Sequence, residues 1–246
     1  MTQVSRRDLL KTAGAAGAVS AGAAQAQQQQ PAAPHAEQAQ TGEGRGVLFF
    51  FNDPEGDFIE AAVDRLIPAE PEWQGARWAG VLHFIDRQLA GAFGAGARMY
   101  LKGPWEPDAP PQQGYQLRHT PAEVYRIGIE EARVKIRERY GREFVDLATA
   151  EMDAALTALE TGEMALPTIP SAVFFETLLA NTVEGFFADP AYGGNRDMIG
   201  WRMVGFPGAY AQYVELVDVH DLAYSRAPIS IADQQARLAH IGAHRQ

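Results

Sequence analysis

The sequence predicts a mainly α-helical domain, and three observations lead to that prediction. Apolar residues recur three and four positions apart in several stretches, whereas the alternation typical of strands is weak throughout. Helix-capping residues followed by proline precede two of these stretches. Segments rich in glycine, proline and aromatic residues separate the stretches. We therefore expect a single compact helical domain over residues 47–246, with long loops rich in these residue types.

The first predicted helix covers residues 53–67. Asp53 can cap it, Pro54 suits its first turn, and Pro68 ends the apolar pattern. Residues 77–90 form the second predicted helix. Its apolar face consists of Trp78, Val81, Leu82, Ile85 and Leu89. Before both helices, residues 47–51 suggest a short strand or an extended piece.

Three further helices are expected in the second half of the chain. Thr120, Pro121 and Glu123 form a capping box that starts a helix reaching about Tyr140. Helices are also predicted over residues 149–160 and after Pro170. The preceding segment, residues 91–119, is rich in glycine and proline, and long loops of this kind are often functional.

The N-terminus has the pattern of an export signal. Arg6 and Arg7, with a preceding serine, two following apolar residues and a lysine, resemble the twin-arginine signal, which is read by a translocase for folded proteins. A short Ala- and Gly-rich run follows, and residues 24–26 have the small-x-small form of a cleavage site. We expect a signal peptide over residues 1–26, a disordered Gln/Ala/Pro tether over residues 27–46 and periplasmic localisation.

Composition excludes several classes of function. The formal charge is −10, and it becomes −12 once the net +2 of residues 1–26 is removed. An acidic chain of this kind is a poor nucleic-acid binder, because phosphate binding needs clustered lysine and arginine. The absence of cysteine excludes disulfides, thiolate-held iron–sulfur clusters and covalently attached c-type haem in this chain.

The most unusual stretch runs from residue 185 to residue 213. It combines glycines with large aromatic side chains and arginine, a composition enriched at the energetic centres of protein interfaces. The candidate interface residues are Tyr192, Gly193, Gly194, Asn195, Arg196, Trp201 and Phe206. These aromatic residues could equally be core residues that clamp a loop. The glycine pattern does not fit a dinucleotide-binding loop.

Catalytic and metal-binding patterns are weak. His240 and His244 are four residues apart but have no third metal ligand nearby, whereas Asp218, His220 and Asp221 could bind a cation only weakly. No serine lies in a G-x-S-x-G elbow. We therefore assign no catalytic, cofactor-binding or metal-binding residue to this chain.

Several sequence blocks resemble the gluconate 2-dehydrogenase subunit 3 family, the small subunits of membrane-bound flavin-dependent sugar and sugar-acid dehydrogenases. The resemblance extends over roughly residues 48–213. The matching blocks are 50–52, 62–68, 79–81, 84–86, 174–176, 184–190, 192–197 and 200–208. The family has no well-established catalytic residues, so the resemblance transfers none.

The resemblance implies a non-catalytic subunit that escorts a large FAD-binding partner during folding and export. A multihaem cytochrome c subunit would pass electrons to the membrane, to which this chain would be attached only through the complex. FAD and haem c would then belong to these partners.

Two alternatives remain open at this stage. The chain could be a free-standing exported enzyme or metal-binding protein with its own site near His220 and Asp221. It could also be a periplasmic ligand-binding module in which residues 91–119 act as a lid.

Overall fold

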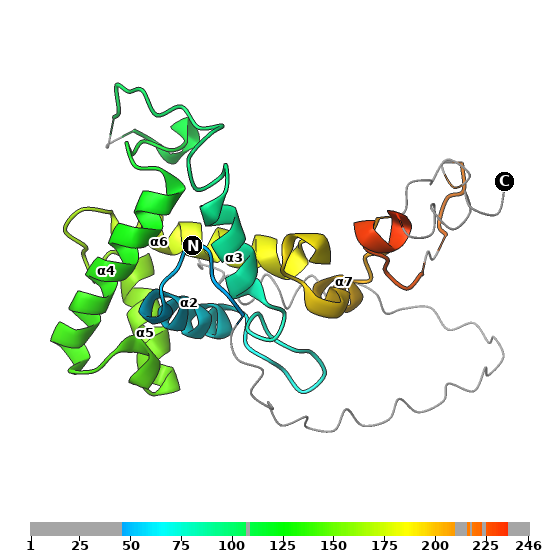
Figure 1. The fold of residues 1–246 in the computed structure, drawn as a ribbon, viewed down its shortest axis with the longest axis horizontal. Coiled ribbons are helices and arrows are strands. Elements are labelled where there is room, and N and C mark those ends of the chain that lie inside the picture. Colours follow the sequence, from blue (N-terminus) through cyan, green and yellow to red (C-terminus); the bar gives the residue numbers. More distant parts are fainter. Residues whose placement is uncertain (1–45, 107–108, 210–215, 217, 223–224, 236–246) are drawn as a thin grey trace. The chain divides into compact units, whose positions relative to one another are not determined.

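A computed structural model describes residues 46–106, 109–209, 216, 218–222 and 225–235. Within these ranges the fold is mainly α, as predicted, with long irregular segments between helices (Figure 1). The labelled helices are α2 (Asp53–Leu66), α3 (Val81–Ala90), α4 (Pro121–Tyr140), α5 (Thr149–Glu160), α6 (Ser171–Phe187) and α7 (Ile199–Val204), and residues 231–235 are helical as well. Short 3₁₀ turns are η1 (Pro111–Gln113), η2 (Phe144–Asp146), η3 (Pro190–Tyr192) and η4 (Arg196–Met198).

Reciprocal capping boxes start α2 and α4. The Thr120 hydroxyl accepts from the Glu123 backbone N–H, and the Glu123 carboxylate accepts from the Thr120 backbone N–H. At α2 the same exchange joins Asn52 and Glu55, so Asn52 is the cap rather than the expected Asp53. Each box satisfies backbone donors that have no partner inside the helix, which fixes where the helix begins.

The structure corrects one local prediction and decides between the two alternatives of another. The second helix begins at Val81 rather than at Arg77, because Gly80 has a left-handed backbone with φ of 77°. Residues 47–51 form no strand, because their N–H groups donate to a buried side chain instead of to a neighbouring strand. The only β-bridge among the described residues joins Gly208 to Ile229.

The core forms around α6, which packs against α2, α3, α4, α5 and α7. Phe174 of α6 lies against Tyr125 of α4 and Phe58 of α2, with ring centroids 6.1 and 6.4 Å apart. The Tyr125 hydroxyl donates to the Asn181 side chain at 2.9 Å, which satisfies a polar group at the centre of the core. None of the described helices combines the length and the apolarity that crossing a bilayer requires.

Candidate functional site

Residues 188–198 fold back from the end of α6 onto the residues that precede α3. The Arg196 backbone N–H donates to the Ala79 carbonyl at 3.1 Å. A Cβ atom at Gly194 would lie 2.1 Å from the Gly185 carbonyl oxygen, so only glycine permits this approach to α6. The glycines of this segment therefore bring backbones together, and the segment is held by the domain.

Asn195 lies at the centre of this segment and is completely buried. Its side-chain amide donates to the Ala188 carbonyl, and its side-chain oxygen accepts from the Gly200 backbone N–H, both at 2.8 Å. Its φ of 48° is in the left-handed region, which asparagine tolerates better than most residues. Asn195 thus ties the end of α6 to the beginning of α7.

Trp201 is also a core residue, with 6% of its surface exposed. Its indole N–H donates to the Phe187 carbonyl at 2.8 Å, and its ring meets Phe206 edge-on at 5.3 Å between centroids. Gly208 packs on the same indole, because a Cβ atom there would lie 2.9 Å from the ring. The core interpretation therefore holds for this residue.

The candidate residues that remain accessible are Tyr192, Arg196 and Phe206. The exposed fractions of Tyr192 and Phe206 are 53% and 47%, and the Arg196 side chain is exposed as well. Gly193 is partly buried and Gly194 fully so. The candidate residues thus fall into two groups. One group is buried and stabilises the fold, and the other is accessible to a second molecule.

Arg196 and Tyr192 belong to a larger surface that includes the start of α3. The Arg196 guanidinium lies 5.6 Å from the Trp78 ring centroid. The Arg87 side chain crosses Gly193, where a Cβ atom would lie 2.9 Å from a guanidinium nitrogen. We refer to Trp78, His83, Arg87, Tyr192 and Arg196 as the arginine–aromatic surface. Sequence reasoning missed the half formed by Trp78, His83 and Arg87, although His83 and Arg87 lie four positions apart in α3.

This surface carries positive charge in an acidic chain. Neither Arg87 nor Arg196 has an ion-pair partner among the described residues. Burial, followed by the charge of Arg87, lowers the pKa of His83, and Arg196 acts in the same direction. Asp86 and Glu60 oppose this effect on the His83 pKa. Charged guanidinium groups beside exposed rings are well suited to contact a partner's carboxylates.

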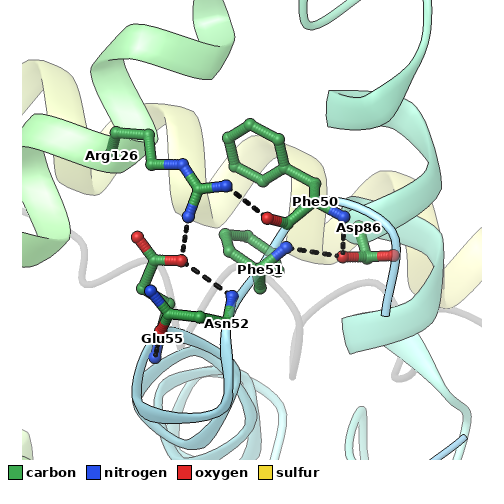
Figure 2. A network of polar contacts seen from close by, with 6 residues as sticks. All are labelled: Phe50, Phe51, Asn52, Glu55, Asp86 and Arg126. Atoms are coloured by element: carbon green, nitrogen blue, oxygen red, sulfur yellow. Dashed lines mark hydrogen bonds and ion pairs between the residues drawn. The ribbon is translucent and has the colours of Figure 1, made fainter. Parts of the chain in front are cut away.

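A second polar cluster anchors the chain where the domain begins (Figure 2). The backbone N–H groups of Phe49, Phe50 and Phe51 donate to the buried Asp86 carboxylate at 2.7, 2.9 and 2.9 Å. Arg126 of α4 donates to the Phe50 carbonyl and to the Glu55 carboxylate, and its guanidinium stacks on the Phe50 ring at 4.1 Å. All the contacts of this cluster that are described above are internal to the fold, so we interpret the cluster as structural.

The described part of the chain gives no support to the metal-site candidate near His220. His220 and Asp221 are exposed, and no group of three or more potential metal ligands occurs among the described residues. His240 and His244 lie outside the described residues, as do Arg6 and Arg7.

The fold and the surface together define a helical protein whose accessible arginine and aromatic side chains suit binding to another protein. The family model for gluconate 2-dehydrogenase subunit 3 matches residues 53–208, well over half of the chain. The chain belongs to the gluconate 2-dehydrogenase subunit 3 family. No curated protein and no solved structure matches it.

Proposed function

We propose that this chain is the non-catalytic small subunit of a periplasmic FAD-dependent gluconate or sugar dehydrogenase complex. In this role it binds the large flavoprotein subunit and escorts it during folding and export. The observation that carries the proposal is the family match over residues 53–208, because the family is named as a subunit of a dehydrogenase. FAD belongs to the large subunit, and haem c belongs to a cytochrome subunit that links the complex to the membrane.

The arginine–aromatic surface supports protein binding. Large rigid rings and arginine supply most of the binding energy in many protein interfaces, since they bury area at low entropic cost. Tyr192 and Arg196 are exposed next to a backbone held by Asn195 and Gly194, so the fold fixes the backbone from which they project. A backbone that is fixed before binding loses little freedom on binding, which favours affinity.

The escort role can be tested at the twin arginines. Replacing Arg6 and Arg7 together with lysine removes the pattern read by the twin-arginine translocase while keeping the charge. We expect this chain and its flavoprotein partner to remain in the cytoplasm, as measured by immunoblotting and dehydrogenase activity of periplasmic fractions. If the flavoprotein still reaches the periplasm, the escort role is wrong, even where the two chains form a complex.

The docking surface can be tested by charge reversal. We expect Arg87→Glu with Arg196→Glu to weaken binding to the large subunit more than tenfold, or about 1.4 kcal/mol. The matched control is Arg98→Glu, which reverses an exposed arginine in the loop after α3. Affinity is measured by titrating the purified large subunit, after circular dichroism shows that the variants fold. Equal affinities for the two variants would place the interface elsewhere.

A further inference from the structure

Residues 229–235 lie against the residues that follow α7. The Ala209 N–H donates to the Ile229 carbonyl at 2.8 Å, and the Ile229 N–H donates to the Pro207 carbonyl at 3.2 Å. These bonds flank the bridge between Gly208 and Ile229. A Cβ atom at Gly208 would lie 2.2 Å from the Ile229 carbonyl oxygen, so only glycine permits this approach. We refer to residues 229–235 as the C-terminal strap.

The strap has a helix start of its own and is packed on the domain. The Ser230 hydroxyl accepts from the Asp233 N–H at 3.1 Å, and the Asp233 carboxylate accepts from the Ser230 N–H at 3.0 Å. Ile229 and Ser230 are both buried. The strap nevertheless lies beyond residue 208, where the match to the family model ends, so the family match does not account for it.

Asp189 joins the strap to the segment that carries Tyr192. One of its carboxylate oxygens accepts from the Ile231 N–H at 2.8 Å, and the other accepts from the Ala191 N–H at 2.9 Å. The bond from Ala191 caps η3, which ends with Tyr192. The Tyr192 N–H in turn donates to the Asp189 carbonyl at 2.9 Å. The same residue therefore holds both the strap and the turn that bears Tyr192.

The Asp189 carboxylate is buried, so its two hydrogen bonds depend on each other. A buried carboxylate is costly unless hydrogen bonds replace its hydration. If the strap leaves, one oxygen loses its donor, and the side chain gains other ways to satisfy its charge. The cap on η3 then competes with hydration of the carboxylate. Tyr192 is held less firmly as a result.

We propose that the C-terminal strap stabilises the arginine–aromatic surface through Asp189, so that the large subunit binds more tightly while the strap is docked. Asp189 is a positioning residue, because it acts through the turn that bears Tyr192. This inference rests on the proposed docking of the large subunit at that surface. Because such coupling is reciprocal, the bound large subunit also stabilises the docked strap.

Ile231→Pro tests the coupling. Proline removes the N–H that Asp189 accepts, and the first turn of a helix tolerates proline. The matched control is Ile231→Ala, which shortens the side chain but keeps the N–H. Docking of the strap is followed by hydrogen exchange at the Ala209 amide of the isolated chain. Affinity is measured by titrating the purified large subunit.

For Ile231→Pro we expect about tenfold faster exchange at Ala209, the value of a hydrogen bond to a charged group. Binding of the large subunit should weaken by up to about the same factor, because only the docked state binds tightly. Ile231→Ala should stay close to the wild type in both measurements. Thermal melting is measured first to show that each variant folds.

A second pair of variants keeps the test decisive if Ile231→Pro does not fold. Asp189→Asn leaves one acceptor oxygen for two N–H groups, so it should also speed exchange at Ala209 and weaken binding. Its matched control is Asp197→Asn, which removes the same charge from an exposed position in the same segment and should bind as the wild type does.

The outcomes separate this inference from the proposed function. If the wild type binds the large subunit and the folded Ile231→Pro or Asp189→Asn variant binds equally well, the coupling is wrong and the docking role stands. Unchanged exchange at Ala209, or equal changes in Ile231→Pro and Ile231→Ala, would also overturn the coupling. If the wild type itself does not bind the large subunit, both proposals are wrong.

Discussion

Trp201 and Tyr192 have similar sequence surroundings but opposite positions in the fold. Both are large rings beside glycine in the same segment, yet Trp201 is buried and Tyr192 is exposed. The difference arises from long-range contacts, since the Trp201 indole donates to Phe187 and packs on Gly208. Residue composition predicted an unusual segment. It could not separate the buried half of that segment from the accessible half.

A substitution at Trp201 should therefore affect stability more than partner binding. We expect Trp201→Ala to lower the free energy of unfolding by about 3–5 kcal/mol, because it removes a buried ring and leaves a cavity. Urea unfolding followed by circular dichroism measures the change. The folded fraction should bind the large subunit with unchanged affinity. If Trp201→Ala instead binds the large subunit more weakly while keeping wild-type stability, Trp201 belongs to the interface.

His83 should make stability depend on pH. Its pKa is lowered below 6.5 in the folded chain, mainly by burial and then by Arg87, so the unfolded chain binds the proton more readily. The neutral form favours folding, and stability is lost as the pH falls from 6.5 towards the lowered pKa. Between pH 7 and pH 5, the urea midpoint of His83→Gln should fall less than that of the wild type. Parallel pH profiles for the two proteins would show that His83 does not contribute.

At the scale of elements, helix boundaries were predictable where local chemistry sets them. Thr120 and Glu123 start α4 as expected, and α5 spans the predicted residues 149–160. Helix α7 was not predicted, because it is short and the residues before it have positive φ values held by contacts with α3 and α6. The contacts with Ala79 and Arg87 join positions more than a hundred residues apart in the chain, which periodicity cannot reveal.

Asp86 shows how one side chain positions an element that lacks regular structure. Its carboxylate accepts three backbone N–H groups from residues 49–51, which holds this segment against α3 in place of a strand. In the sequence, Asp86 stood out only as part of block 84–86, which resembles the family, and no structural role was predicted for it. Its role depends on the approach of a segment 35 to 37 residues away.

Replacing Asp86 tests this anchor. Asp86→Ala leaves three N–H groups without their acceptor, so we expect it to destabilise the domain by at least about 3 kcal/mol. Hydrogen exchange should accelerate most at the amides of Phe50 and Phe51. Glu138→Ala, which removes an exposed carboxylate of α4, is the control and should change little. Unchanged exchange at Phe50 and Phe51 would show that Asp86 does not hold the segment.

At the scale of the whole molecule, the fold class and the family followed from the sequence, whereas the accessible surface required the structure. The arginine–aromatic surface combines Trp78 and Arg87 with Tyr192 and Arg196, which are over a hundred residues further along the chain. Because these groups are brought together only by folding, neither half was recognisable alone. Their accessibility distinguishes this surface from the buried contacts of the core.

The most direct test of the accessory-subunit role is purification of the tagged chain from its native host under mild conditions. We expect a flavoprotein to co-purify with the tagged chain. When salt or mild denaturant separates the chains, the flavin absorbance and the dehydrogenase activity should remain with the large subunit. The isolated chain should then show neither flavin absorbance nor activity. Flavin that stays with this chain after separation, or dehydrogenase activity of the chain alone, would contradict the non-catalytic role.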